Sequence, residues 1–341
     1  MKIHEKIVAL LCILGIFVAV GSQGVPGMVG CQDAFASDGC QGTFAAAGSQ
    51  AAFGAEAGLT CETFPLERNG IPLHLDRVKK ENITPAGQIL LVHGSTYSSH
   101  EFDIDYQDYS LVQRLAREGY AVWRLDIAGY GQSGPVEDGF LPDTAYAAED
   151  INAAVEKIVK ISGQNRIDVL GWSWGTMTAG RFAAEHPEHL RKLILYAPIL
   201  SGLGVQERGE AFSHNTWESA AEDFQRNADG SFDLTITDPI IIELFCSSCW
   251  HYDGDSSPRG WSKDAFAEES TKLIDLERIS SPTLIIYGDK DPYMNLDLLG
   301  SALESLPEGS ELHMIEGGSH IMMYEIPCYH EFQIRIVEFL K

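Results

Sequence analysis

Short apolar runs alternate with longer amphipathic runs from residue 88 to the end of the chain. The apolar runs have the length of buried strands and lie near residues 88–93, 120–126, 166–172, 192–198, 283–288 and 311–316. Helical periodicity marks the runs near residues 107–118, 144–162, 174–186, 295–305 and 328–340. Alternation of this kind predicts an α/β fold with a parallel sheet covered by helices on both faces.

Two features modify this regular pattern. Residues 62–68 and 71–78 flank Asn69-Gly70, a dipeptide typical of tight antiparallel hairpins, so two opening strands are expected there. The alternation then stops at Pro198 and resumes at Pro282. The residues between them are polar and aromatic by turns, which predicts an insertion over 201–281.

Residues 171–175 read Gly-Trp-Ser-Trp-Gly and lie between a strand-like run and a helix-like run. In that context the pattern G-x-S-x-G indicates a strained turn that exposes its serine hydroxyl. Glycines on both sides leave room for the strand and the helix to approach each other. Ser173 is therefore the candidate nucleophile.

A base and an acid follow the serine in the chain. The strand-like run at 311–316 leads to Gly317-x-x-His320, and the run at 283–288 leads to Gly288-x-x-Asp291. A serine hydroxyl is weak until a base takes its proton, which is the role expected of His320. Asp291 would orient the imidazole and stabilise its cation. Asp289 is the alternative acid, although the spacing and Pro292 favour Asp291.

Two upstream loops complete the pattern: His93-Gly-Ser-Thr96, and Asp126 to Ser133, which reads D-x-x-G-x-G-x-S. Together with the order Ser…Asp…His, they make residues 62–341 resemble the α/β-hydrolases. The resemblance implies a mostly parallel eight-stranded α/β-hydrolase sheet with helices on both faces and a lid formed by the insertion. It also implies an oxyanion hole from the backbone N–H groups of Trp174 and Ser95, with Thr96 as the alternative to Ser95. His93 is expected to have a structural role.

The side chains beside the nucleophile bear on specificity. Trp172 and Thr96 are expected to line the substrate pocket, which favours an apolar or aromatic group near the scissile bond. The resemblance thus predicts a carboxylesterase-like serine hydrolase (EC 3.1.1) that works through an acyl-enzyme and needs no metal or organic cofactor. A serine at position 173 argues against dehalogenases and epoxide hydrolases, which carry an aspartate there.

Other functions remain open. The Gly-x-Ser-Trp-Gly elbow also resembles that of proline iminopeptidases, but their oxyanion loop usually reads His-Gly-Gly-Pro-Gly. Lactonases and cofactor-free haloperoxidases share the same three catalytic residue types. A non-catalytic binding protein is the alternative of a different class. A formal net charge of −25 disfavours nucleic acid and anionic lipid headgroups as partners, and the oligomeric state stays open.

The N-terminus has the features of a secretion signal. Lys2 and Lys6 precede an apolar run from Ile7 to Val20, and Ala34-Phe-Ala36 offers a cleavage site. Residues 1–36 are therefore expected to be a signal peptide and residues 37–60 a flexible tether to a hydrolase domain over 61–341. Lipidation at Cys31 and retention of the apolar run as an anchor are the alternatives. Export permits disulfides, so Cys246 and Cys249 are expected to form a local one, with metal binding, redox chemistry or reduced thiols as alternatives.

Overall fold

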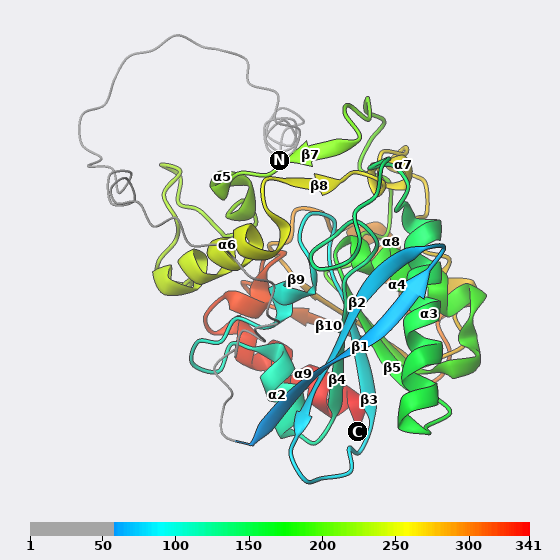
Figure 1. Cartoon of the computed structure of the whole chain (residues 1–341). Helices are drawn as coiled ribbons and strands as arrows, with labels where there is room; N and C mark the ends of the chain where they lie inside the picture. The colour runs from blue at the N-terminus through cyan, green and yellow to red at the C-terminus, as the bar shows by residue number, and fades with distance from the viewer. Residues whose placement is uncertain (1–57) are drawn as a thin grey trace, which may run out of the picture. The chain divides into compact units, whose positions relative to one another are not determined.

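A single eight-stranded sheet organises residues 58–341, which are the part of the chain that the computed structural model describes (Figure 1). The expected signal peptide and nearly all of the expected tether lie outside the described residues. In spatial order the strands are β1 (Leu59–Arg68), β2 (Ile71–Lys80), β4 (Ala121–Leu125), β3 (Gln88–Val92), β5 (Ile167–Trp172), β6 (Leu190–Tyr196), β9 (Thr283–Gly288) and β10 (Glu311–Ile315). Only β2 runs antiparallel to its neighbours in this sheet, so the predicted mostly parallel sheet is confirmed.

The turn between β1 and β2 follows from its two central residues. Asn69 and Gly70 both have positive φ, 52° and 80°, as a two-residue hairpin turn requires. β1 begins at Leu59, two residues before the expected start of the domain at residue 61. The ladder extends over all ten residue pairs from Leu59–Lys80 to Arg68–Ile71.

Helices cover the sheet on both sides, as predicted. α3 (Thr144–Ser162) and α4 (Trp174–Glu185) pack together on one side, and α2 (Leu111–Arg117) and α9 (Cys328–Leu340) pack together on the other (Figure 1). α8 (Leu296–Ser305) connects β9 to β10. The Asp143 side chain caps α3 by accepting a hydrogen bond from Tyr146 N, and Gly163 ends that helix with a φ of 71°.

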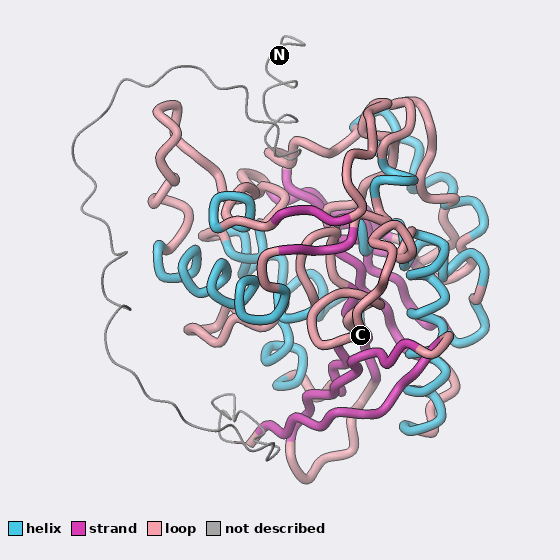
Figure 2. The backbone as a smooth tube through the Cα atoms, turned by 45° about the horizontal axis from the view of Figure 1, so that its top comes forward, coloured by secondary structure: helices cyan, strands magenta, loops and turns pink. Residues whose placement is uncertain are grey.

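The segment between β6 and β9 interrupts this alternation. Its elements are β7 (Phe212–His214), α5 (Trp217–Ala220), α6 (Pro239–Asp253), β8 (Ser256–Pro258), α7 (Ser262–Ala265) and the 3-10 turn η3 (Leu276–Arg278). Most of the segment is loop (Figure 2). α6 packs on the 3-10 turn η1 (Ser99–Phe102), which follows β3. Two further 3-10 turns are η2 (Pro187–His189) and η4 (Met322–Tyr324).

Burial of the central strands explains why the sequence predicted them as apolar runs. β3, β4 and β5 are buried over their whole length, as strands covered on both faces must be. The apolar runs at residues 88–92, 121–125 and 167–172 therefore belong to the sheet. None of the helices formed by residues 58–341 combines the length and the apolar character that a bilayer span needs.

The expected disulfide between Cys246 and Cys249 is not formed. Both residues lie in α6 as buried free thiols, and the described Cys61 and Cys328 are free as well. Burial raises the pKa of Cys246 to about 12, so this thiol stays neutral. Cys246 and Cys249 fill the interior side of α6 as small apolar side chains. The C-x-x-C pattern therefore serves helix packing.

Candidate active site

Ser173 occupies the turn between β5 and α4 in a conformation that few residues adopt. Its φ is 56° and its ψ is −123°, and a positive φ is strained for a residue with a side chain. Neighbouring backbone holds it there, because Ser173 N donates to Tyr196 O at 3.1 Å and Thr176 N donates to Ser173 O at 2.9 Å. The turn is thus the elbow that the motif predicts.

The flanking glycines are required by close backbone approach. A Cβ on Gly175 would lie 2.5 Å from the carbonyl oxygen of Val92, and a Cβ on Gly171 would collide with the carbonyl oxygen of Gly175. At either position a Cβ would lie closer to a carbonyl oxygen than a van der Waals contact allows. Strand β3, strand β5 and helix α4 can meet at Ser173 only because these two positions carry no side chain.

His320 and Asp291 meet in the loops that follow β10 and β9. His320 Nδ1 lies 2.8 Å from Asp291 Oδ2, and both side chains are buried. The other oxygen of Asp291 accepts a hydrogen bond from Tyr293 N at 2.9 Å. Burial opposes the charged imidazole, but the carboxylates of Asp291 and Asp223 outweigh it and raise the pKa of His320. This arrangement suits a base that must hold a proton transiently.

Asp289, the alternative acid, has different partners. Its Oδ1 accepts a hydrogen bond from Gly317 N at 2.6 Å, and its Oδ2 lies 2.9 Å from Lys290 Nζ. Asp289 therefore ties the loop after β9 to the loop after β10. Of the two aspartates, Asp291 is the one that contacts His320.

The backbone carbonyl of His320 is fixed by two aromatic side chains. Trp172 Nε1 donates to His320 O at 3.0 Å, and Tyr196 Oη donates to the same oxygen at 2.9 Å. Only 4% of Trp172 is exposed, and its ring stacks on Tyr196. The residue expected to line the substrate pocket thus packs behind the imidazole. The Trp174 side chain is also buried, with Nε1 donating to Thr144 Oγ1 at 3.1 Å.

The loop after β3 lies against the elbow. A Cβ on Gly94 would lie 3.5 Å from the Cβ of Ser173. Gly94 N itself donates to Glu101 Oε1 at 2.7 Å. Among residues 58–341, no acceptor is bonded to the N–H of Ser95 or of Trp174, the two expected oxyanion donors. Ser95 and Thr96 are half-buried, and their hydroxyl oxygens lie 3.5 Å apart.

His93 has the structural role expected of it. Its Nε2 accepts a hydrogen bond from Ile127 N at 3.0 Å, so the proton sits on Nδ1, which lies 2.8 Å from Gly94 O. Complete burial lowers the pKa of His93 and keeps the ring neutral. The imidazole thereby joins the loop after β3 to the loop after β4.

Sequence reasoning missed three acidic residues near these groups. Glu101 is buried, and burial raises its pKa well above the ordinary range. Glu222 and Asp223 follow α5, and Ser319 Oγ donates to Asp223 O at 3.3 Å beside His320. Burial and the neighbouring Asp223 raise the pKa of Glu222 to about 7. Burial also raises the pKa of Asp223. The signal in the sequence for Glu222 and Asp223 was the acidic character of the insertion, whereas Glu101 lies outside the insertion, in η1.

Two groups of described side chains have the composition of a metal site. One comprises His74, His100 and Asp126, and the other comprises Glu149, Glu185 and His186. Neither group includes a residue of the Ser173–His320–Asp291 set.

Comparisons with known proteins show what the chain is similar to. A family model described as serine aminopeptidase, S33, matches residues 83–327. A putative non-heme chloroperoxidase of Synechocystis sp. is 26% identical over 69% of this chain and 85% of its own length. A pimeloyl-[acyl-carrier protein] methyl ester esterase of Neisseria meningitidis serogroup C is also 26% identical, over 74% of this chain and 90% of its own length. The bromoperoxidase structure from Bacillus anthracis superposes with a TM-score of 0.59 at 20% identity, covering 82% of this chain and 99% of that one.

Proposed function

We propose that this chain, which belongs to the α/β-hydrolase family described as serine aminopeptidase, S33, is a serine hydrolase that cleaves carboxylic esters. The observation that carries the proposal is the strained elbow serine together with a buried imidazole–carboxylate pair. These groups follow β5, β9 and β10, which lie in the same half of the sheet with β6 between β5 and β9. Catalytic groups of open α/β sheets gather at the carboxyl ends of their strands.

The proposed chemistry begins at Ser173. His320 Nε2 accepts the hydroxyl proton while Ser173 Oγ attacks the ester carbonyl. Asp291 holds the proton on Nδ1 and stabilises the imidazolium. The backbone N–H groups of Ser95 and Trp174 donate to the oxyanion, each worth about 3–4 kcal/mol in the transition state. The alcohol leaves with the proton from His320, and water then hydrolyses the acyl-enzyme by the same steps in reverse.

The preference for an ester with an apolar or aromatic group rests on the surroundings of His320. The Tyr293 ring lies 4.7 Å from the imidazole, and Tyr97 lies beside Ser95 and Thr96 and packs against Phe245 of α6. A similar protein of N. meningitidis carries the name of a methyl ester esterase, which also favours esters over amides. In this proposal the segment 201–281 is the lid that closes over the substrate.

An aminopeptidase is the second candidate, favoured by one observation. Glu222 and Asp223 place two carboxyl groups within electrostatic range of Tyr293 and the second of them within range of His320. Carboxylates beside the scissile bond would bind the free amine of a peptide substrate. The printed description of the matching family supports the same activity.

A substrate panel separates these functions. The panel holds p-nitrophenyl esters of graded chain length, aryl esters, a lactone and a prolyl-anilide, each tested with the native protein and with Ser173→Ala. We expect the esters to turn over and the variant to lose at least about a thousandfold in kcat. Turnover of the prolyl-anilide alone would replace the esterase by the aminopeptidase. No turnover, and no labelling of Ser173 by a serine-directed phosphonate, would leave a binding protein.

We also propose that the protein is exported to the periplasm or the cell exterior. The support is the charged start, the apolar run and the Ala-Phe-Ala site of residues 34–36. Mass spectrometry of the protein from the native cell should find a mature chain that begins at residue 37. A mature chain that begins at a lipidated Cys31 would replace cleavage at residue 36 by a lipid anchor.

A further inference from the structure

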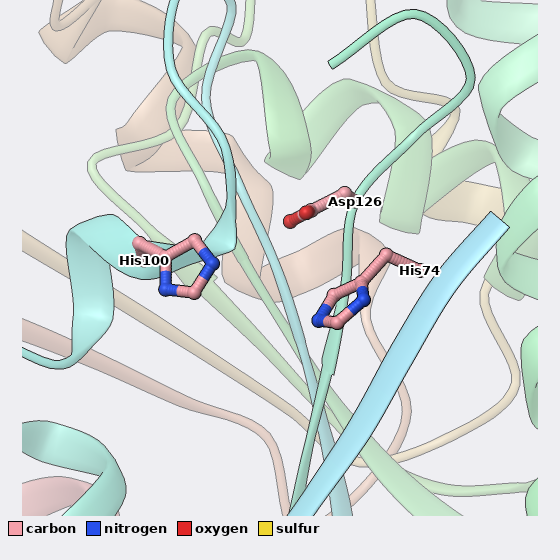
Figure 3. A group of neighbouring side chains, drawn as sticks. All are labelled: His74, His100 and Asp126. Carbon is pink, nitrogen blue, oxygen red and sulfur yellow. The ribbon is translucent and has the colours of Figure 1, made fainter. Parts of the chain in front are cut away.

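Three side chains from separate segments, none of them belonging to the Ser173–His320–Asp291 set, converge on one another. His74 lies on β2, His100 in η1 and Asp126 in the loop that follows β4, and Figure 3 shows the three groups turned toward a common space. One potential ligand atom of each lies within 4.8 Å of the others. Two imidazoles and one carboxylate are a set that divalent transition metals favour.

His74 offers a nitrogen that makes no hydrogen bond and has one longer ionic contact within residues 58–341. Its Nε2 is buried and has no hydrogen-bond partner among the described residues. The nearest carboxylate oxygen, Asp76 Oδ2, is 3.5 Å away and already accepts from Arg124 at 2.5 Å. Buried polar atoms in native proteins almost always have a partner, so an unpaired ring nitrogen points to a ligand.

The other two groups are held in place by their surroundings. Asp126 Oδ1 accepts from Ser99 N at 3.0 Å and from Ser99 Oγ at 2.6 Å, and Asp126 Oδ2 accepts from Gln132 N at 3.0 Å. The His100 ring stacks on Tyr252, with Nε2 at 3.3 Å from Gln132 Oε1. Such contacts orient ligands before a metal arrives.

The local charge also favours a cation. Arg124, the buried guanidinium nearby, is bonded by Asp76 through Nε at 2.9 Å and by Asp103 through Nη1 at 2.9 Å. These two carboxylates offset its positive charge, and Asp126 adds a third. The three carboxylates therefore outnumber the one guanidinium, and the surroundings of His74 and His100 carry an excess of negative charge before any ion binds.

We propose that His74, His100 and Asp126 bind a divalent transition metal ion, with Zn²⁺ the best match. Bonds of about 2.0–2.2 Å place the ligands of a tetrahedral Zn²⁺ about 3.4 Å apart, so the three side chains would draw together by about 1 Å. A water molecule would complete the coordination. Because the ligands come from β2, η1 and the β4 loop, the ion would clamp the opening hairpin to the loop that carries Ser95. Its role is structural and adds no step to the hydrolysis.

The second group of potential ligands supplies a matched control. Glu149, Glu185 and His186 are half-buried or exposed, and His186 Nε2 is already engaged with Glu149 at 2.7 Å. His186→Gln removes an imidazole from this surface group and leaves the buried group intact. A protein of charge −25 binds cations weakly at many places, so the comparison of His74→Gln with His186→Gln separates a built site from surface binding.

The experiment measures Zn²⁺ binding to the full chain after treatment with EDTA, by competition with a chromogenic chelator and by calorimetry. We expect one equivalent of Zn²⁺ to bind tightly to the native protein and to His186→Gln, and its addition to raise the melting temperature of both. His74→Gln should bind at least tenfold more weakly. No stoichiometric binding by the native protein, or equal loss in both variants, would overturn the proposal.

Spectroscopy of the native protein tests the ligands without a variant that could fail to fold. Co²⁺ in place of Zn²⁺ should give the visible absorption of a four-coordinate site. X-ray absorption of the Zn²⁺ form should show two imidazoles at about 2.0 Å. A spectrum with one imidazole or none would contradict the assignment of His74 and His100 even if an ion binds.

Discussion

The protein has two groups of largely buried imidazoles and carboxylates, and the two groups differ in the contacts that their ring nitrogens make. In the first group, His320 Nδ1 is hydrogen-bonded to Asp291 at 2.8 Å. The backbone carbonyl of His320 accepts hydrogen bonds from Trp172 and Tyr196. In the second, His74 Nε2 is buried without a hydrogen-bond partner among the described residues. The difference teaches that residue type alone does not determine chemistry. A carboxylate hydrogen-bonded to the ring at 2.8 Å prepares it to take a proton, whereas a ring nitrogen with only a 3.5 Å ionic contact, beside a second imidazole, is suited to bind an ion.

The largest effects on kcat and on Zn²⁺ binding are expected from replacing one histidine in each group. His320→Gln removes the proposed base and is expected to reduce kcat by about a thousandfold or more, with the Zn²⁺ affinity retained. His74→Gln should do the reverse, with a loss of less than tenfold in kcat and a weakened response of the melting temperature to Zn²⁺. Kinetics and thermal melts on both variants measure the contrast. A large loss of kcat in both variants would show that the groups are not independent.

The two aspartates after β9 sharpen the comparison within the first group. Asp291→Asn should lower kcat by about a thousandfold to ten-thousandfold, because the imidazole loses the carboxylate that sets its tautomer. Asp289→Asn should change kcat by less than tenfold, since that side chain bonds Gly317 N and Lys290 instead. Steady-state kinetics on the two variants decide between them, and an equal loss would contradict the assignment of Asp291.

The pH dependence of the reaction reports the same contact. Burial lowers the pKa of His320, but the carboxylates of Asp291 and Asp223 outweigh burial and raise this pKa above its ordinary value of 6.5. The base acts in its neutral form, so kcat/KM should rise with pH, with a midpoint above 6.5. The midpoint should move down in Asp291→Asn because the charge that stabilises the imidazolium is gone. A profile of kcat/KM between pH 5 and 9 measures both midpoints.

The smallest effect is expected from the residues behind the imidazole. Trp172→Phe and Tyr196→Phe each remove one of the two donors to His320 O. One such hydrogen bond is worth about 0.5–1.5 kcal/mol, so kcat should fall about twofold to tenfold in either variant. If Trp172 instead lines the substrate pocket, Trp172→Phe will change the ranking of esters by chain length, and Tyr196→Phe will not.

The sheet was predictable because its signals are local. A buried strand is an apolar run wherever it lies, and β9 (Thr283–Gly288) and α3 (Thr144–Ser162) have the predicted bounds. The candidate catalytic residues were also found locally, since each follows a strand in a short glycine motif. Strand pairing then brings His320 and Asp291 together without further information from the sequence.

What the sequence did not predict depends on contacts between distant segments. His74 alternates with Leu73 and Leu75 along β2 and looks like any partly exposed strand residue. Its proximity to His100 and Asp126 exists only after β2 pairs with β4 and η1 folds over them. The disulfide expected from Cys246 and Cys249 was wrong because the pattern is equally compatible with the buried side of a helix.

The positions of the site residues along the chain affect when activity can appear. His320 follows β10, the edge strand that pairs only with β9, and it is separated by 147 positions from Ser173 in the numbering. During synthesis the elbow can therefore form long before the proposed base exists. Hydrolysis would begin only once the last strand has docked, so the recovery of activity during refolding reports completion of the sheet. We expect it to lag behind the recovery of secondary structure, which stopped-flow circular dichroism beside an ester assay would measure.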